Sequence, residues 1–273
     1  MDLFPVLKRI VAAAGYTGNL DSWLLLFGLV FARLATAINL APFLGGQNVP
    51  AQVRVGLSAV IAVLLMPSLP AAQGVGPILA LALLVKEALT GALIGFLAQI
   101  VFWGIEMAGA LIDNQRGMNQ ISLYTPQLAG NTSLLGMLQV QAAVALLFTF
   151  DGHLYYVRAL ADSFQTIPAT ELPRFTAQGF GMAQFLLRAT ADLFVVALRL
   201  SAPVLLALFL VDVCFGVFNR VTAQVPIHSE NQTVKAFVSL FVLVLVLPLL
   251  TGQLREYPQQ LFSQIGALMA SLR

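Results

Sequence analysis

The first candidate for chemistry in the sequence is an acid close to a base, in Asp151-Gly152-His153. Residues so near in sequence rarely have the geometry of a catalytic dyad, and no nucleophile stands beside them. The sequence has no G-x-S-x-G element, no glycine-rich phosphate loop and no metal-binding histidine pair. We therefore interpret this segment as a turn at a helix end, with Gly152 as the permissive position.

Cysteine and histidine are too sparse to suggest a metal or redox site. Cys214 is the only cysteine, so it can form neither an internal disulfide nor a zinc site. The two histidines, His153 and His228, lie far apart. The sequence thus predicts no catalytic residue, no enzyme activity, no cofactor and no bound metal.

Charged side chains inside apolar runs are the second candidate. On insertion scales each of them costs about 2.5–3.5 kcal/mol at the centre of a lipid-exposed helix. They must therefore pair, face water or lie outside the hydrocarbon layer. They are Arg33, Lys86, Glu87, Glu106, Arg188, Asp192, Arg199 and Asp212, with Asp113 at the edge of a run.

The spacing of these charges favours pairing in a buried network. At about 100° per residue, Arg188, Asp192 and Arg199 share one helix face. Lys86 and Glu87 are adjacent, so they point in different directions and need partners from other helices. Three interpretations remain open: structural ion pairs in a helical bundle, a proton or ion relay, and helices packed into a larger assembly.

The connection Asp113–Pro126 is the third candidate. It is longer than the 2–8 residues usual between bundle helices, and it mixes Met, Ile, Leu and Tyr with amide and small side chains. One interpretation is a loop packed on neighbouring helices. The other is a constriction in which apolar groups close a passage, since irregular backbone at membrane depth must be buried or line a cavity.

The elements that position these residues are membrane helices. The chain has 273 residues, of which 59% are hydrophobic, and 14 basic against 12 acidic side chains, with a mean hydropathy of +0.88. A soluble domain is about 45–50% apolar and about 25% charged. Composition therefore excludes a soluble or disordered protein, and the net charge of +2 is too small for a nucleic-acid binder.

We expect an all-α membrane protein with about six to eight hydrophobic helices in a single integral-membrane domain, residues 1–273. The third and fifth runs are too long for one ordinary span, and the fifth is interrupted at Pro203. A short amphipathic helix is predicted at Gln259–Leu272. The apolar runs are Trp23–Leu44, Val55–Ala72, Ile78–Ile112, Leu134–Phe150, Phe180–Phe218 and Val234–Leu250.

The order and spacing of short landmarks resemble the export-gate family shared by flagellar and virulence type III secretion systems, the flagellar R and injectisome T subunits. They extend over most of the chain. The landmarks are Arg33, Ala41-Pro42-Phe43, Val49-Pro50, Arg54, Gly109, Asp113, Gln115, Gly117, Phe150, Gly152-His153, Ser163-Phe164, Pro168, Ala202-Pro203, Asp212, Gly216, Arg220, Gln224 and Lys235.

The resemblance implies hairpins packed with P-type and Q-type subunits into a helical export gate in the bacterial inner membrane, partly on the periplasmic side. Further implied partners are the switch subunit, the export ring, rod or needle proteins, exported polypeptides and membrane lipid. It also implies gated passage of unfolded protein with a lumenal plug. By carry-over, the plug is Gly117, Met118, Asn119, Gln120, Ile121, Ser122, Leu123 and Tyr124.

One segment departs from the family pattern. Residues 222–232 are more polar than the family's stretch and have a displaced proline, Pro226. Two other functions remain open from the residues. A small-solute secondary transporter would use the intramembrane charges and show repeat-related halves, and a lipid-acting membrane enzyme would show clustered catalytic residues. We see neither feature, and we expect an export-gate subunit.

Overall fold

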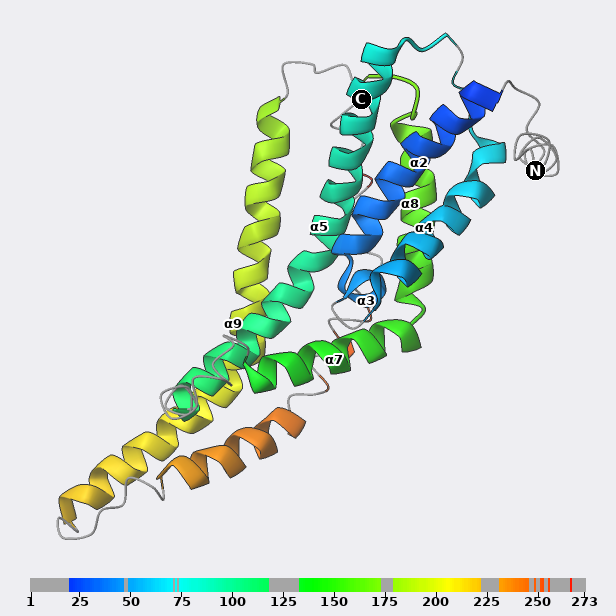
Figure 1. Cartoon of the computed structure of the whole chain (residues 1–273). Coiled ribbons are helices and arrows are strands. Elements are labelled where there is room, and N and C mark those ends of the chain that lie inside the picture. Colours follow the sequence, from blue (N-terminus) through cyan, green and yellow to red (C-terminus); the bar gives the residue numbers. More distant parts are fainter. Residues whose placement is uncertain are drawn as a thin grey trace. The chain divides into compact units, whose positions relative to one another are not determined.

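The computed structural model describes residues 20–46, 49–70, 72, 74–117, 133–172, 179–221 and 231–245, together with residues 248, 251, 252, 255 and 266. Every regular element in these residues is helical (Figure 1), so the prediction of an all-α protein is confirmed. The predicted plug residues Met118–Tyr124 lie outside the described residues, as do almost all of Gln259–Leu272 and most of 222–232.

The helices form two compact units. Unit 1 comprises Met1–Gln99, His153–Leu187 and Pro258–Arg273, and unit 2 comprises Ile100–Gly152 and Arg188–Tyr257. Each unit is therefore assembled from segments that are far apart in sequence. The single integral-membrane domain over residues 1–273 stays a prediction.

Helix α2 (Leu20–Leu40) provides much of the core of unit 1. Its buried apolar residues recur every three or four positions, which is the pattern of a helix that buries one face. They are Trp23, Leu26, Leu29, Val30, Leu34, Ala37 and Ile38. This face also carries Arg33, which is as buried as the leucines around it.

Prolines set the helix starts that follow α2. Pro42 lies in the first turn of the short helix α3 (Pro42–Gly45), and Pro50 directly precedes α4 (Ala51–Leu65). Proline suits these places because the first amide groups of a helix have no intrahelical partner. Both helices pack against α2 (Figure 1), and α4 continues into the short 3-10 helix Met66–Ser68.

Helix α5 (Pro77–Arg116) has 40 residues, about 60 Å at 1.5 Å per residue and about twice the hydrocarbon thickness of a bilayer. Its first part packs closely on α2. A side chain at Gly91 would collide with the Arg33 carbonyl and the Thr36 hydroxyl, and one at Gly95 would have its Cβ 2.6 Å from that of Leu40. Small residues four apart are a common means of bringing apolar helices together.

The chain turns sharply between α7 (Leu134–Thr149) and α8 (Gly152–Thr166). The turn expected around Asp151 is confirmed, but the residue with positive φ is Asp151 (56°) and not Gly152. Gly152 is required for space instead, because a Cβ there would lie 2.7 Å from the Leu147 side chain.

Helix α9 (Gly179–Val221) runs without interruption through Pro203, so the predicted break is wrong. Proline removes one backbone hydrogen bond, yet the apolar residues on both sides favour continuing the helix. In unit 2 the residues Val204 and Leu208 of α9 form a core with Ile112 and Leu135. Three residues of the helix Asn231–Leu245 pack on this core: Val238, Val242 and Leu243.

Four described helices are long and apolar enough to cross a membrane, or five if α7 and α8 together count as one span. Large apolar side chains cover their exposed faces. On α4 and α5 these faces carry, for example, Leu64, Ile78 and Leu81, and on α9 they carry Leu206 and Phe209. Such surfaces are stable only against lipid or against other chains.

Candidate functional site

Arg33 is the centre of a buried polar cluster in unit 1. Its guanidinium group forms a bidentate pair with Glu87 of α5: Nε donates to Oε2 at 2.5 Å and Nη2 donates to Oε1 at 2.8 Å. Nη1 donates to the Ser163 hydroxyl of α8 at 3.0 Å, and Nη2 also donates to the Ile167 carbonyl at 2.8 Å. The guanidinium carbon lies 4.0 Å from the centroid of the Phe164 ring, within cation–π range. Arg33 thereby joins three helices.

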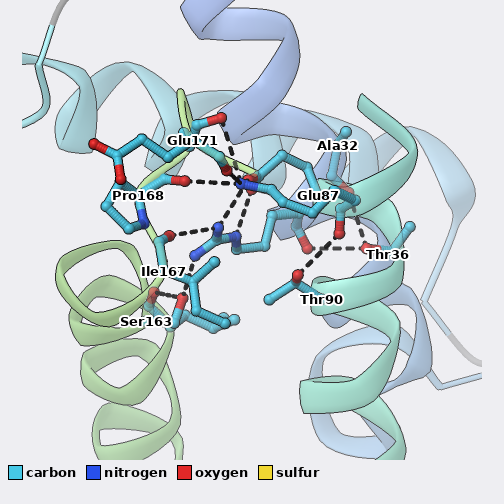
Figure 2. Close-up of polar contacts among 12 residues, drawn as sticks. Ala32, Thr36, Glu87, Thr90, Ser163, Ile167, Pro168 and Glu171 are labelled. Carbon is cyan, nitrogen blue, oxygen red and sulfur yellow. Dashed lines mark hydrogen bonds and ion pairs between the residues drawn. The ribbon is translucent and has the colours of Figure 1, made fainter. Parts of the chain in front are cut away.

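Lys86 brings a second cation to this cluster. Its Nζ lies 2.5 Å from Glu87 Oε1 and donates to the carbonyls of Pro168 at 2.8 Å and Glu171 at 3.0 Å. Figure 2 shows Ser163, Ile167, Pro168 and Glu171 of the α8 side facing Glu87 of α5. Two cations share one carboxylate here. The backbone carbonyls of residues 167–171 stabilise the remaining positive charge through their dipoles.

The Arg33 cluster, which we define as Arg33, Lys86, Glu87, Ser163 and Phe164, is almost closed to solvent. Arg33 and Glu87 are 0% exposed and Lys86 is 8% exposed. A buried pair with this geometry contributes little net stability over an apolar core, but removing one partner leaves a buried unpaired charge and costs about 3–5 kcal/mol. The cluster can therefore fix how α2, α5 and α8 are arranged.

A second cluster lies in unit 2, at the two ends of the segment 118–132. Asp113, in the last turn of α5, accepts bonds from the Ser133 hydroxyl at 2.6 Å and from the Leu135 amide at 3.0 Å, both at Oδ2. Its Oδ1 accepts a bond from Arg116 at 3.2 Å. Ser133 is the N-cap of α7 and accepts the amide of Gly136 at 2.8 Å. One carboxylate therefore joins the end of α5 to the beginning of α7.

Lys235 binds the end of α5 in the same cluster. Its Nζ donates to the Gln115 carbonyl at 3.2 Å, near the end of α5, and pairs with Asp212 of α9 at 2.5 Å. Asp212 also accepts bonds from the side chains of Gln115 at 3.2 Å and Asn231 at 3.3 Å. We call Asp113, Gln115, Ser133, Asp212 and Lys235 the loop-base cluster.

Glycines allow the helices of the loop-base cluster to approach each other closely. A side chain at Gly109 of α5 would collide with the backbone of Gly136 of α7, so these two helices touch there without side chains between them. Gly117 follows the last turn of α5 with a positive φ of 78°, which glycine adopts without cost. Of the predicted plug residues, it is the one inside the described part of the chain.

The remaining predicted charges are not brought into either cluster. Glu106 on α5 is half-buried, and Arg188, Asp192 and Arg199 on α9 are exposed. Within the described residues these four make no ion pair. The described residues therefore do not bury the charged face of α9, and a buried network at these positions stays a prediction.

Two kinds of contact had no counterpart among the sequence predictions. Backbone carbonyls, such as those of Ile167 and Pro168, leave no mark in a sequence. Ser133 could have been found, because a serine directly before an apolar run is the usual signal for a helix start. Gln115 and Lys235 were identified as landmarks but without a chemical role.

The described residues contain no group of three or more His, Cys, Asp or Glu side chains that could hold a metal ion. Both clusters consist of cations, carboxylates, hydroxyls and carbonyls that satisfy one another. What this chemistry can do is hold helices and helix ends in place.

The sequence matches a protein family described as bacterial export proteins, family 1, over residues 24–261. It is 30% identical over 257 residues to a flagellar biosynthetic protein FliR of Pectobacterium carotovorum subsp. carotovorum, covering 93% of this chain and 95% of that protein. It is 29% identical to a FliR protein of Bacillus subtilis, covering 80% and 84% of the two chains. It is also 31% identical to a Yop proteins translocation protein T of Yersinia pestis, over 59% and 60% of the chains.

Proposed function

The chain belongs to family 1 of the bacterial export proteins, and on this basis we propose that it is a structural and gating subunit of a type III protein export channel. In this role it lets unfolded polypeptides pass and closes the passage between them. The plug is the segment Gly117–Tyr124, with its apolar part supplied by Met118, Ile121, Leu123 and Tyr124.

The observation that supports a plug is the loop-base cluster. Asp113 and Ser133 hold the two ends of the segment 118–132 together, while Lys235 caps the end of α5. Caps of this kind stabilise helix ends in general. Here they also hold the beginning of α7 close to the end of α5, as a loop of defined position requires.

The proposed partners are P-type and Q-type export-gate subunits, the switch subunit, the export ring and the rod or needle proteins. Exported polypeptides and membrane lipid are further proposed partners. The relatives' names place those proteins in flagellar biosynthesis and in Yop translocation. The large exposed apolar faces of α4, α5 and α9 are what a chain needs if other membrane proteins and lipid cover it.

The proposed location is the bacterial inner membrane, crossed several times, with part of the assembly on the periplasmic side. No catalytic role, metal or cofactor is part of the proposal. Passage through the gate would be driven by the partners.

Replacing the apolar plug residues tests the proposed role of the loop. A variant with Ser at Met118, Ile121, Leu123 and Tyr124 should assemble but leak ions, because the blocking groups are gone while the loop keeps its length. The measurement is ion flux through the purified complex in lipid vesicles. The matched control replaces the polar residues of the same segment, with Asn119→Ser, Gln120→Ser and Ser122→Gly, and should stay closed. A tightly closed first variant would refute the plug.

Assembly tests the wider proposal. Native mass spectrometry of the detergent-extracted protein, made beside its genomic neighbours, should find it in a complex with several copies of two other small membrane proteins. A stable partner-free monomer or homodimer would instead favour a secondary transporter.

A further inference from the structure

Helix α8 carries polar side chains along its outer face. Arg158 and Gln165 are exposed, Tyr155 is 42% exposed and Asp162 is half-buried. These residues recur every three or four positions, so they follow one side of the helix. Leu154 adds one exposed apolar side chain in the first turn. With one cation and one anion, this face has no net charge.

The opposite side of α8 is fixed against α2 (Figure 1). The Tyr156 hydroxyl donates to the Ala37 carbonyl at 2.9 Å. One turn before the end of α8, the Ser163 hydroxyl accepts the bond from Arg33 at 3.0 Å. The Tyr156 ring also packs edge-on against Phe43 of α3, with 5.1 Å between the ring centroids. These contacts fix the rotation of α8 about its axis, so its polar face points away from α2.

The two charges on the outer face of α8 have no ion-pair partner among the described residues. Arg158 and Asp162 are one turn apart, a spacing at which opposite charges can pair, yet they do not pair with each other. Each would cost about 2.5–3.5 kcal/mol at the centre of a lipid-exposed helix. Together with Gln165 they exclude lipid as the environment of this face.

Helix α8 lies at the depth of a helix that can cross a membrane. Helix α2 is long and apolar enough to do so. Arg158 and Asp162 fall between the two contacts that join α8 to α2 at Ala37 and Arg33. Polar side chains at membrane depth face the interior of a bundle or a water-filled cavity. Because this face points away from the bundle contact with α2, it requires a water-filled space.

Other exposed faces of unit 1 are apolar. Helix α4 exposes Val60 and Leu64, and the first part of α5 exposes Leu81 and Leu89. Such faces suit lipid or other membrane chains. Unit 1 therefore presents two kinds of surface, and the outer face of α8 is of the kind that needs water.

We propose that the outer face of α8, formed by Tyr155, Arg158, Asp162 and Gln165, lines the water-filled passage and is contacted by the exported polypeptide. This inference rests on the proposed export function and names where this chain meets its substrate. One cation, one anion, an amide and a phenol offer hydrogen bonds and charges of either sign. Such a face favours neither one charge nor one sequence, which suits unfolded polypeptides of varied composition.

Thiol labelling of introduced cysteines tests this position of α8. Arg158→Cys and Gln165→Cys are made in a Cys214→Ser background, because Cys214 is exposed. The reagent is a charged, membrane-impermeant methanethiosulfonate, present on both sides of vesicles that contain the assembled complex. Both α8 sites should react at least about tenfold faster than the matched controls Val60→Cys and Leu81→Cys, since a thiolate forms in water and not in lipid.

An exported protein arrested in the complex gives the second readout. It should slow the labelling of both α8 sites, because the arrested chain occupies the space in front of them. No reaction at either α8 site would show that lipid or another chain covers this face, and would overturn the proposal. Labelling that the arrested protein leaves unchanged would place α8 beside a different aqueous space and would overturn it as well. Should Arg158→Cys not assemble, Gln165→Cys decides alone.

The outcomes distinguish this inference from the proposed function. If the apolar-plug variant leaks and the α8 sites stay unreactive, the plug stands and the role of α8 is refuted. If the plug variant stays tight, the plug is refuted, whereas labelling of α8 that an arrested exported protein prevents would still support contact between α8 and the exported chain.

Discussion

Arg33 and Glu87 illustrate what a single residue contributes to this fold. The sequence identifies both as charges that need a partner, since each interrupts an apolar run. It cannot identify the partner, because the two residues are 54 positions apart and other charges compete for the role. The carbonyls that neutralise Lys86 are still less predictable, since any residue type could supply them.

At this scale we predict that Glu87→Gln destabilises the protein by about 3–5 kcal/mol, because Arg33 is left buried without its anion. Thermal unfolding of the detergent-solubilised complex should show a clearly lower midpoint. Glu171→Gln is the matched control: it is exposed, and Lys86 contacts its backbone carbonyl, which the substitution leaves in place. Equal midpoints for Glu87→Gln and wild type would contradict the structural role of the cluster.

At the scale of elements, helices are predictable from apolar runs and their partners are not. The runs predict where α2, α5, α7 and α9 lie, but not that α9 continues through Pro203 or that α5 is a single helix of 40 residues. Hydropathy measures whether a segment avoids water. It does not measure where a helix ends once neighbouring helices have replaced both water and lipid around it.

The closeness of α2 and α5 depends on Gly91. We predict that Gly91→Ala lowers the unfolding midpoint, although alanine is the better helix former by about 1 kcal/mol, because its Cβ would collide with the Arg33 carbonyl. Gly28→Ala on α2 is the control, since a Cβ there meets nothing within 4 Å. A raised midpoint in Gly91→Ala would show that the two helices can separate at no cost.

At the scale of the whole molecule, the surface of the described helices combines exposed charges with large exposed apolar side chains. The exposed charges Arg188, Asp192 and Arg199 share α9 with exposed Leu198 and Leu206. Lipid suits the leucines but not the charges. The sequence could predict that such charges need partners, but the described residues supply no ion-pair partner for these three.

We therefore predict that Asp192→Ala reduces incorporation of the chain into the complex, since it leaves two neighbouring cations without their acid. Co-purification of the partner subunits with a tagged chain measures this directly. Asp21→Ala, at the exposed start of α2, should co-purify them as wild type does. Normal incorporation of Asp192→Ala would argue against a role of this charged face in assembly.

The partners of Arg33 are synthesised well after Arg33 itself. At about 5–20 residues per second, Glu87 leaves the ribosome roughly 3 to 11 s after Arg33, and Ser163 roughly 7 to 26 s after it. During that interval the first described apolar helix carries an unneutralised cation, which costs about 2.5–3.5 kcal/mol at the centre of a bilayer. We therefore expect α2 and α5 to enter the membrane together rather than one after the other, because Glu87 of α5 supplies the anion for Arg33.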